Sequence, residues 1–130
     1  MAGMTSATAS AVAEYFAALR AMDAERWVAV FAPDAISHDP LGTPPHHGHE
    51  ALRRFILSIL ALWTEVGLTE DFVSISGHSA AIKWTGRGTG RNGAHVTFEG
   101  IDCIEVNEAG KIVLVKAFWN PGPVIQAITA

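Results

Sequence analysis

The stretch FEGIDCIEV, residues 98–106, places a carboxylic acid in the middle of an apolar row. Successive side chains of a β-strand point to opposite faces, so Phe98, Gly100, Asp102, Ile104 and Val106 share one face of this segment. An apolar face of a strand is the face that packs on a core. A carboxylate there must find a strong partner, or give up its charge and stay a neutral acid that donates a hydrogen bond.

Two states of Asp102 remain open at this stage. The acid can pair with Lys83, Arg87 or Lys116 on a neighbouring strand, or it can stay protonated. Periodicity alone does not separate the buried ion pair from the buried neutral acid. Their chemistry is opposite, because the first presents a negative charge and the second presents a hydrogen-bond donor.

The length and composition point to one apolar globular unit. A chain of 130 residues predicts a single domain over residues 1–130. The hydrophobic content of 49% lies at the apolar end of the ordinary range and predicts an apolar cavity or an apolar subunit interface. The net charge is −4 with no basic stripe, so neither nucleic acid nor a membrane is an expected partner.

No targeting or membrane-spanning segment is recognised in the sequence. The N-terminal MAGMTSATAS lacks a basic region followed by an apolar one, and the apolar patch ILSILALW is too short to span a bilayer. We therefore expect a cytoplasmic protein. Cys103 is the only cysteine, which excludes an internal disulfide, and we expect it to act as a small, inert strand residue.

The N-terminal part is predicted to hold two helices. The first runs from Thr5 or Ser6 to about Met22, with an apolar stripe formed by Val12, Tyr15, Leu19 and Met22. Tyr15 is therefore expected to face inward. A second, shorter helix is capped by Asp23, ends at Pro33 and bears Trp27, Val30 and Phe31.

The rest of the chain is predicted to add one helix and a series of strands. A brief strand at 35–39 leads into the loop PLGTPPHHG, and a helix then carries a stripe from Leu52 to Trp63 and closes at Gly67. Strands are expected around 68–76, 80–85, 95–106 and 111–119. Helices followed by a meander of strands imply an α+β fold, with helices on one face of a mostly antiparallel sheet.

Two motifs invite functional interpretations that their context argues against. Gly88 to Gly93 spells GxGxxG, but the following residues alternate as a strand, so we interpret the motif as a glycine-rich hairpin turn. His46, His47 and His49 share a loop with no further metal-ligand cluster nearby, so no metal is predicted.

Several stretches together resemble the ketosteroid isomerase family, the steroid Δ5-isomerases. They are HDPLGTPPHHGHEALRRF at 38–55, AEYFAALRAMDAERWVAVFAPDA near the start, and IDCIEVNEAGKIVLVKAFW near the end. The resemblance covers nearly the whole chain from Val12 to Trp119. It implies the cone-shaped α+β fold shared with nuclear transport factor 2, whose curved sheet and N-terminal helices enclose an apolar pocket.

The resemblance implies three catalytic residues and three residues of the substrate-binding wall. Asp39 corresponds to the catalytic base, Tyr15 to the tyrosine of the oxyanion hole, and Asp102 to an aspartic acid that the family keeps neutral as a second donor. Trp119, Val115 and Phe98 would grip the steroid together with the third helix.

The implied reaction moves the C5–C6 double bond of a Δ5-3-ketosteroid to C4–C5 through a dienolate. No cofactor is implied. The expected partners are a small-molecule steroid and a second copy of the chain, paired through the outer face of the sheet as a homodimer.

The sequence departs from some members of the family behind the oxyanion tyrosine. Where those members carry further tyrosines, this chain has Phe31 and Ile56, and Tyr15 is its only tyrosine. A site of two donors without a tyrosine relay is therefore expected. Two other readings of the same fold stay open: a polyketide cyclase or hydrolase-type enzyme, and a noncatalytic module that binds a hydrophobic ligand.

Overall fold

The computed structural model describes residues 2–130, with side chains from Thr5 onward. Its helices are α1 (Ala2–Arg20), α2 (Ala24–Val28), α3 (Gly48–Leu60) and α4 (Pro121–Thr129). Its strands are β1 (Phe31–His38), β2 (His46–His47), β3 (Trp63–Ser76), β4 (Ser79–Gly90), β5 (His95–Val106) and β6 (Ile112–Phe118). The predicted α+β class is confirmed.

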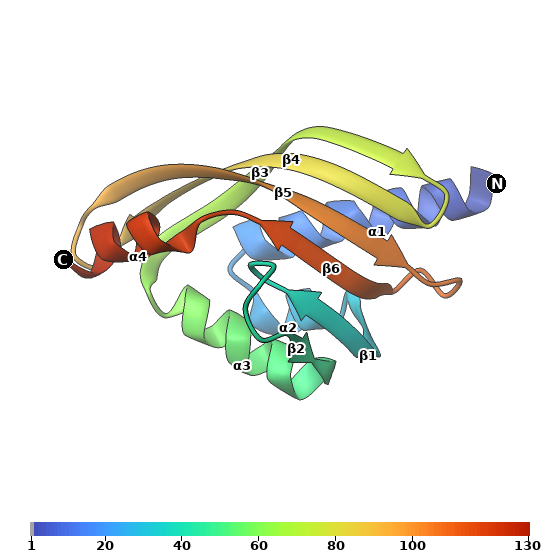
Figure 1. The fold of residues 1–130 in the computed structure, drawn as a ribbon, viewed down its shortest axis with the longest axis horizontal. Coiled ribbons are helices and arrows are strands. Elements are labelled where there is room, and N and C mark those ends of the chain that lie inside the picture. The colour runs from blue at the N-terminus through green and yellow to red at the C-terminus, as the bar shows by residue number, and fades with distance from the viewer. Residues whose placement is uncertain (1) are drawn as a thin grey trace.

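The six strands form one mixed sheet in the order β2-β1-β6-β5-β4-β3. β1 and β6 are parallel, whereas the other neighbours are antiparallel, as predicted for most of the sheet. Figure 1 shows the long strands β3, β4 and β5 curving over α1, α2 and α3, which lie on one side of the sheet. No helix of the described residues covers the opposite side of the sheet (Figure 1).

The core forms where the helices meet the concave face of the sheet. Along β4 and β5 the even-numbered residues face the helices and the odd-numbered ones face outward. Ile82 and Ile104 are fully buried on this inner face, where they join Phe16 of α1 and Leu52 of α3. Asp102 lies on the same inner face with only 2% of its surface exposed, so the predicted parity of the segment 98–106 is confirmed.

The second helix is shorter than predicted. α2 ends at Val28, and Phe31 and Pro33 belong to strand β1 instead. A proline fits there because the pairing of β1 with β6 shifts register between Phe31 and Ile36, at a point where no regular ladder needs its missing N–H. The first helix also begins earlier than predicted, at Ala2.

The third helix also ends before its predicted limit. α3 stops at Leu60, and both Trp63 and Gly67 lie in β3. Trp63 matches the helical stripe by spacing, but it is buried as the first residue of a strand. The apolar period of a helix continued by chance across the boundary, which is why the sequence pattern placed it too late.

The C-terminal helix α4 was not predicted. The sequence Pro-Gly-Pro at its start suggests a loop, yet proline is well accommodated in the first turn of a helix because no intrahelical partner exists for its N–H. Val124 and Ile128 of α4 pack against Trp63 and form a second, smaller apolar cluster. α4 therefore covers the end of the sheet that holds the start of β3.

The glycine-rich motif is a hairpin, as predicted. Gly88 and Gly90 lie in β4, which is longer than the predicted strand, and a tight turn leads into the antiparallel β5. In the histidine-containing loop, His46 and His47 form the short strand β2 beside β1. Among the described residues, no group of three or more metal-ligating side chains is placed to hold an ion.

The described helices also bear on the membrane question. None of them is both long enough and apolar enough to cross a membrane.

Gly100 is a strict packing constraint in this sheet. It lies opposite Trp84 across β4 and β5, and a Cβ atom at this position would collide with the indole ring of Trp84 and lie 2.8 Å from the carbonyl oxygen of Phe118. We expect Gly100→Ala to lower the free energy of unfolding by about 1–3 kcal/mol, measured by urea denaturation.

Gly122→Ala is the matched control for this change. The nearest atom to an added Cβ there is 3.6 Å away, which is ordinary contact distance, so no loss of stability is expected. Equal stability of Gly100→Ala and the unchanged protein would show that the sheet relaxes around the added methyl group.

Candidate active site

A pocket opens between the concave face of the sheet and the helices. Its walls are mostly apolar, with Phe55, Ile56, Ile59 and Leu60 of α3 on one side and sheet residues on the other. All four tryptophans of the chain and its only tyrosine line this pocket. The polar side chains that reach it from the described residues are Tyr15, Asp39 and Asp102.

Tyr15 reaches the pocket from the inner face of α1, as its position on the apolar stripe predicts. Its ring is 2% exposed and packs edge-on against Phe31 at 6.0 Å and tilted against Trp27 at 5.7 Å, measured between ring centroids. Burial raises the pKa of its phenol well above the ordinary value, and the nearby carboxyls of Asp102 and Asp39 raise it further. Tyr15 is therefore held as a neutral hydrogen-bond donor.

Asp39 follows directly after β1, where the chain leaves the sheet. The peptide bond between Asp39 and Pro40 is cis, and the next N–H, that of Leu41, donates to the carbonyl of Ala117 on β6 at 2.8 Å. This contact holds the segment against β6, next to Trp119. The indole N–H of Trp119 donates to Oδ1 of Asp39 at 2.7 Å.

Asp102 receives its hydrogen bond from a residue that the sequence analysis did not single out. The indole N–H of Trp84 donates to Oδ1 of Asp102 at 3.0 Å, and both side chains are buried. The sequence alone gives no signal for Trp84, because Gly100, which leaves space for its ring, becomes its neighbour only through the pairing of β4 with β5.

The ion-pair alternative for Asp102 is wrong. Lys83, Arg87 and Lys116 lie at positions whose side chains point to the outer face of the sheet, whereas Asp102 points inward. Lys83 pairs on that outer face with Asp71 and with Glu99, at 3.1 and 3.2 Å. A shift of one residue in strand parity is enough to keep a cation and an acid apart.

The two acids of the pocket have raised pKa values for reasons that differ in part. The pKa of Asp102 is raised to about 7, because burial and the charge of Asp39 raise it by more than the Trp84 hydrogen bond lowers it. For Asp39, burial raises the pKa and the hydrogen bond from Trp119 opposes the rise. With a pKa of about 7, Asp102 is about half protonated at neutral pH, while the hydrogen bond from Trp119 favours the ionised form of Asp39.

Such a pocket brings two carboxyl groups and a phenol together in an apolar space. A carboxylate can take a proton from carbon when its pKa is raised, and a phenol and a carboxylic acid can donate to an oxygen that becomes negative. The combination suits proton transfer next to a carbonyl group.

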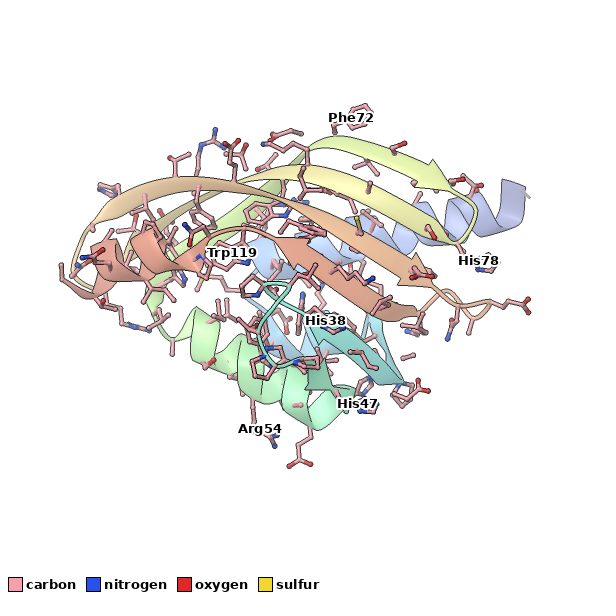
Figure 2. The ribbon with its side chains drawn as sticks, in the orientation of Figure 1. His38, His47, Arg54, Phe72, His78 and Trp119 are labelled. Atoms are coloured by element: carbon pink, nitrogen blue, oxygen red, sulfur yellow. The ribbon has the colours of Figure 1, made fainter. Side chains whose placement is uncertain are left out.

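The predicted substrate wall is found in part. Phe98 and Trp119 line the pocket, and their ring centroids are 5.6 Å apart. Trp119 lies just past the end of β6 and is labelled in Figure 2. Val115 does not line it: this side chain is fully buried in the main core, and Ala117, two residues further along β6, reaches the pocket instead.

The surroundings of Tyr15 contain no tyrosine relay. Phe31 packs on its ring and Ile56 lines the pocket at the two positions expected to lack tyrosine. Trp27 takes much of that space. Its indole N–H is near enough to lower the pKa of Tyr15 slightly, but the contact falls short of a hydrogen bond, and Nε1 of Trp27 is a buried atom without a partner among the described residues.

A family model described as a SnoaL-like domain matches residues 12–115, most of the chain. The chain belongs to the SnoaL-like family. A relative of this SnoaL-like protein, a steroid Δ-isomerase of Nocardioides simplex, is 27% identical over 123 residues, which are 94% of this chain and 97% of the relative.

Solved structures share the fold of this SnoaL-like protein. SalBIII, an epoxide hydrolase/cyclase-like enzyme of pyran ring formation in salinomycin, superposes with a TM-score of 0.79 at 26% identity, covering 87% of this chain and 90% of its own. A Δ5-3-ketosteroid isomerase from Mycobacterium sp. gives a TM-score of 0.78 at 24% identity, covering 88% and 93%.

A further neighbour was solved with a bound steroid. It is a Mycobacterium tuberculosis protein in complex with estradiol-17β-hemisuccinate, with a TM-score of 0.79 at 24% identity, covering 88% of this chain and 94% of its own. Together these similarities confirm the predicted nuclear transport factor 2-like fold and the resemblance to steroid isomerases.

The buried acid makes the stability of this SnoaL-like protein depend on pH. The pKa of Asp102 is about 7 in the folded chain and about 3.9 in an unfolded one, so its contribution is complete below about pH 4 and is lost as the pH rises to about 7. The loss amounts to about 4 kcal/mol. We expect Asp102→Asn, which cannot ionise, to lose correspondingly less stability between pH 4 and 8 in urea denaturation.

The control for this experiment is Asp34→Asn, since Asp34 is an exposed acid of β1. It should follow the unchanged protein over the whole pH range. Parallel curves for Asp102→Asn and the unchanged protein would contradict a neutral Asp102 in the folded state.

Proposed function

We propose that this SnoaL-like protein is a Δ5-3-ketosteroid isomerase, which moves the C5–C6 double bond of the steroid to C4–C5. The observation that carries the proposal is the convergence of Asp39, Tyr15 and Asp102 on one apolar pocket. The similarity to a steroid Δ-isomerase over 94% of the chain supports it.

Asp39 is the base in this proposal. It takes a proton from the carbon between the ketone and the double bond, and it returns the proton two carbons away. A raised pKa makes a carboxylate a stronger base, and the Trp119 hydrogen bond favours the ionised form, which is the form that accepts a proton. The same residue takes and returns the proton, so the reaction needs no cofactor.

Tyr15 and Asp102 are the oxyanion donors. When the proton leaves carbon, negative charge moves onto the ketone oxygen, and two donors already in place stabilise it without the cost of reorganising water. An ionised Asp102 would repel this oxygen. The raised pKa of Asp102 is therefore required by the chemistry.

The apolar walls are proposed to hold the rigid steroid body. Phe98 and Trp119 supply flat aromatic surface from the sheet side, and the pocket residues of α3 supply the other side. In place of Val115, which is buried in the core, we propose Ala117 as the contact from β6, because its small side chain leaves room for a ligand. The neighbour solved with a bound estradiol derivative supports a steroid as the ligand class.

A second enzymatic candidate is an epoxide hydrolase or cyclase activity, favoured by the likeness to SalBIII. Asp39 as base and Asp102 as acid would also suit the opening of an epoxide by an internal hydroxyl. Tyr15 separates the two candidates, since a second donor to the same oxygen is expected for an oxyanion hole and not for an acid–base pair. A module that only binds hydrophobic ligands would bind steroid and turn over neither substrate.

The isomerase proposal is tested by converting a Δ5-3-ketosteroid to its conjugated Δ4 isomer, followed by the ultraviolet absorbance of the enone. Removal of the base in Asp39→Asn is expected to lower kcat by about 10²–10⁴-fold. Loss of one donor in Asp102→Leu or Tyr15→Phe is expected to lower it by about 10²–10³-fold. The activity of the unchanged protein should also fall as the pH rises through about 7, where Asp102 ionises.

Two results would contradict the proposal. Tight steroid binding without turnover would leave only a binding module, and unchanged turnover in Tyr15→Phe would remove the tyrosine from the mechanism. Val115→Ala serves as a matched control for the wall residues, because Val115 lies outside the pocket lining and its truncation should affect stability more than the KM for the steroid.

We also propose that the protein forms a homodimer through the outer face of its sheet. Ile101 and Phe118 are paired across β5 and β6 on this face, and they are 46% and 47% exposed. Phe72 projects from β3 on the side away from the helices (Figure 2) and is 66% exposed. An uncovered apolar surface of this kind is typical of an interface between protein chains.

The dimer is tested by sedimentation equilibrium on Ile101→Glu. A charge in the centre of the proposed interface is expected to shift the protein from dimer to monomer at micromolar concentration. Leu57→Glu, a change at a 51% exposed residue of α3, is the control and should leave the mass unchanged. A monomeric unchanged protein would contradict the proposal.

A further inference from the structure

Trp84 is the direct contact of the buried acid. Its Nε1 lies 3.0 Å from Oδ1 of Asp102, and the two residues are diagonal neighbours on β4 and β5, because Ile82 is the residue paired with Asp102 and Gly100 is the one paired with Trp84. Diagonal neighbours on one face of a sheet are within reach of a large aromatic side chain.

The position of the indole is fixed on several sides. Its ring fills the space left by Gly100, and it packs edge-on against Phe98 at 5.9 Å and against Trp119 at 6.1 Å. Trp84 is only 2% exposed, so a turn of its ring away from Asp102 would require these neighbours to move. The donor is therefore preorganised.

An indole N–H can only donate, so the chemistry of the contact has one direction. Oδ1 of Asp102 must act as the acceptor, and the carbonyl oxygen is the better acceptor of a carboxylic acid. We propose that Trp84 is a positioning residue that keeps the acid proton of Asp102 on Oδ2 and thereby presents one defined O–H donor to the pocket. This inference rests on the proposed function for its catalytic meaning, but the contact itself does not.

The contact has two consequences of opposite sign. The titratable side chains that face the pocket with Asp102 are Tyr15 from α1 and Asp39 from the end of β1, while the lining residues of α3 are apolar and Lys83 and Lys116 point to the outer face. A donor to the carboxylate favours the ionised form. Loss of the Trp84 N–H should therefore raise the pKa of Asp102 while the aim of its proton is lost.

The first experiment follows the side-chain carboxyl of Asp102 by ¹³C NMR as a function of pH in the ligand-free protein, with Asp102→Asn to assign the signal. In Trp84→Phe the midpoint is expected to move upward by roughly one pH unit or more. Trp63→Phe is the control, because Trp63 lines the same pocket and stacks on Phe98, and it should leave the midpoint in place. An unchanged or lowered midpoint in Trp84→Phe would overturn the proposal.

A second variant covers the case in which Trp84→Phe fails to fold. Site-specific incorporation of β-(3-benzothienyl)alanine at position 84 keeps the shape of the indole and replaces its N–H by sulfur. The same upward shift is expected from this isostere. In the isomerisation assay, at a pH where Asp102 is protonated in both proteins, kcat should fall about tenfold with little change in KM.

The two readouts separate the failure of this inference from the failure of the proposed function. If the unchanged protein does not isomerise the steroid, the carboxyl titration still decides whether Trp84 controls Asp102. If it does isomerise the steroid and the isostere keeps both the midpoint and kcat, Trp84 is only a packing residue.

Discussion

The structure depends on the burial of a carboxyl group on an apolar sheet face. Water would solvate a carboxylate far better than this environment does, so the fold has to supply either a counter-charge or a proton. Strand parity removes the counter-charge, because the lysines of β4 and β6 point to the outer face. Asp102 is left with one indole donor and a pKa near neutrality, and the properties of the pocket follow from that choice.

The topology of the sheet brings the second acid to the same place. Asp39 and Trp119 are 80 residues apart in the sequence, yet the parallel pairing of β1 with β6 ends both strands at one side of the pocket. Long-range pairing is thus what turns an aspartate before a proline into a member of the site. Each of the two acids accepts a hydrogen bond from a different tryptophan, so the fold tunes them separately.

Much of this was within reach of the sequence. The alternation of β5 predicted an inward Asp102, and the stripe of α1 predicted an inward Tyr15, because both follow from local periodicity. The resemblance to isomerases added Asp39. The role of Trp84 and the core position of Val115 were out of reach, since both depend on which residues face each other across strands. Helix ends failed where an apolar spacing continued into a strand, as at Trp63, or where prolines opened a helix, as in α4.

The distribution of aromatic residues gives the protein an intrinsic spectroscopic signal for its own cavity. Every tryptophan and the single tyrosine line the pocket, and the described core contributes no such ring elsewhere. The near-ultraviolet absorption, emission and circular dichroism of these rings therefore arise from the walls of one space. Filling or emptying that space alters the environment of the whole set of chromophores at once, so occupancy can be followed in the unlabelled protein with any ligand that is itself transparent.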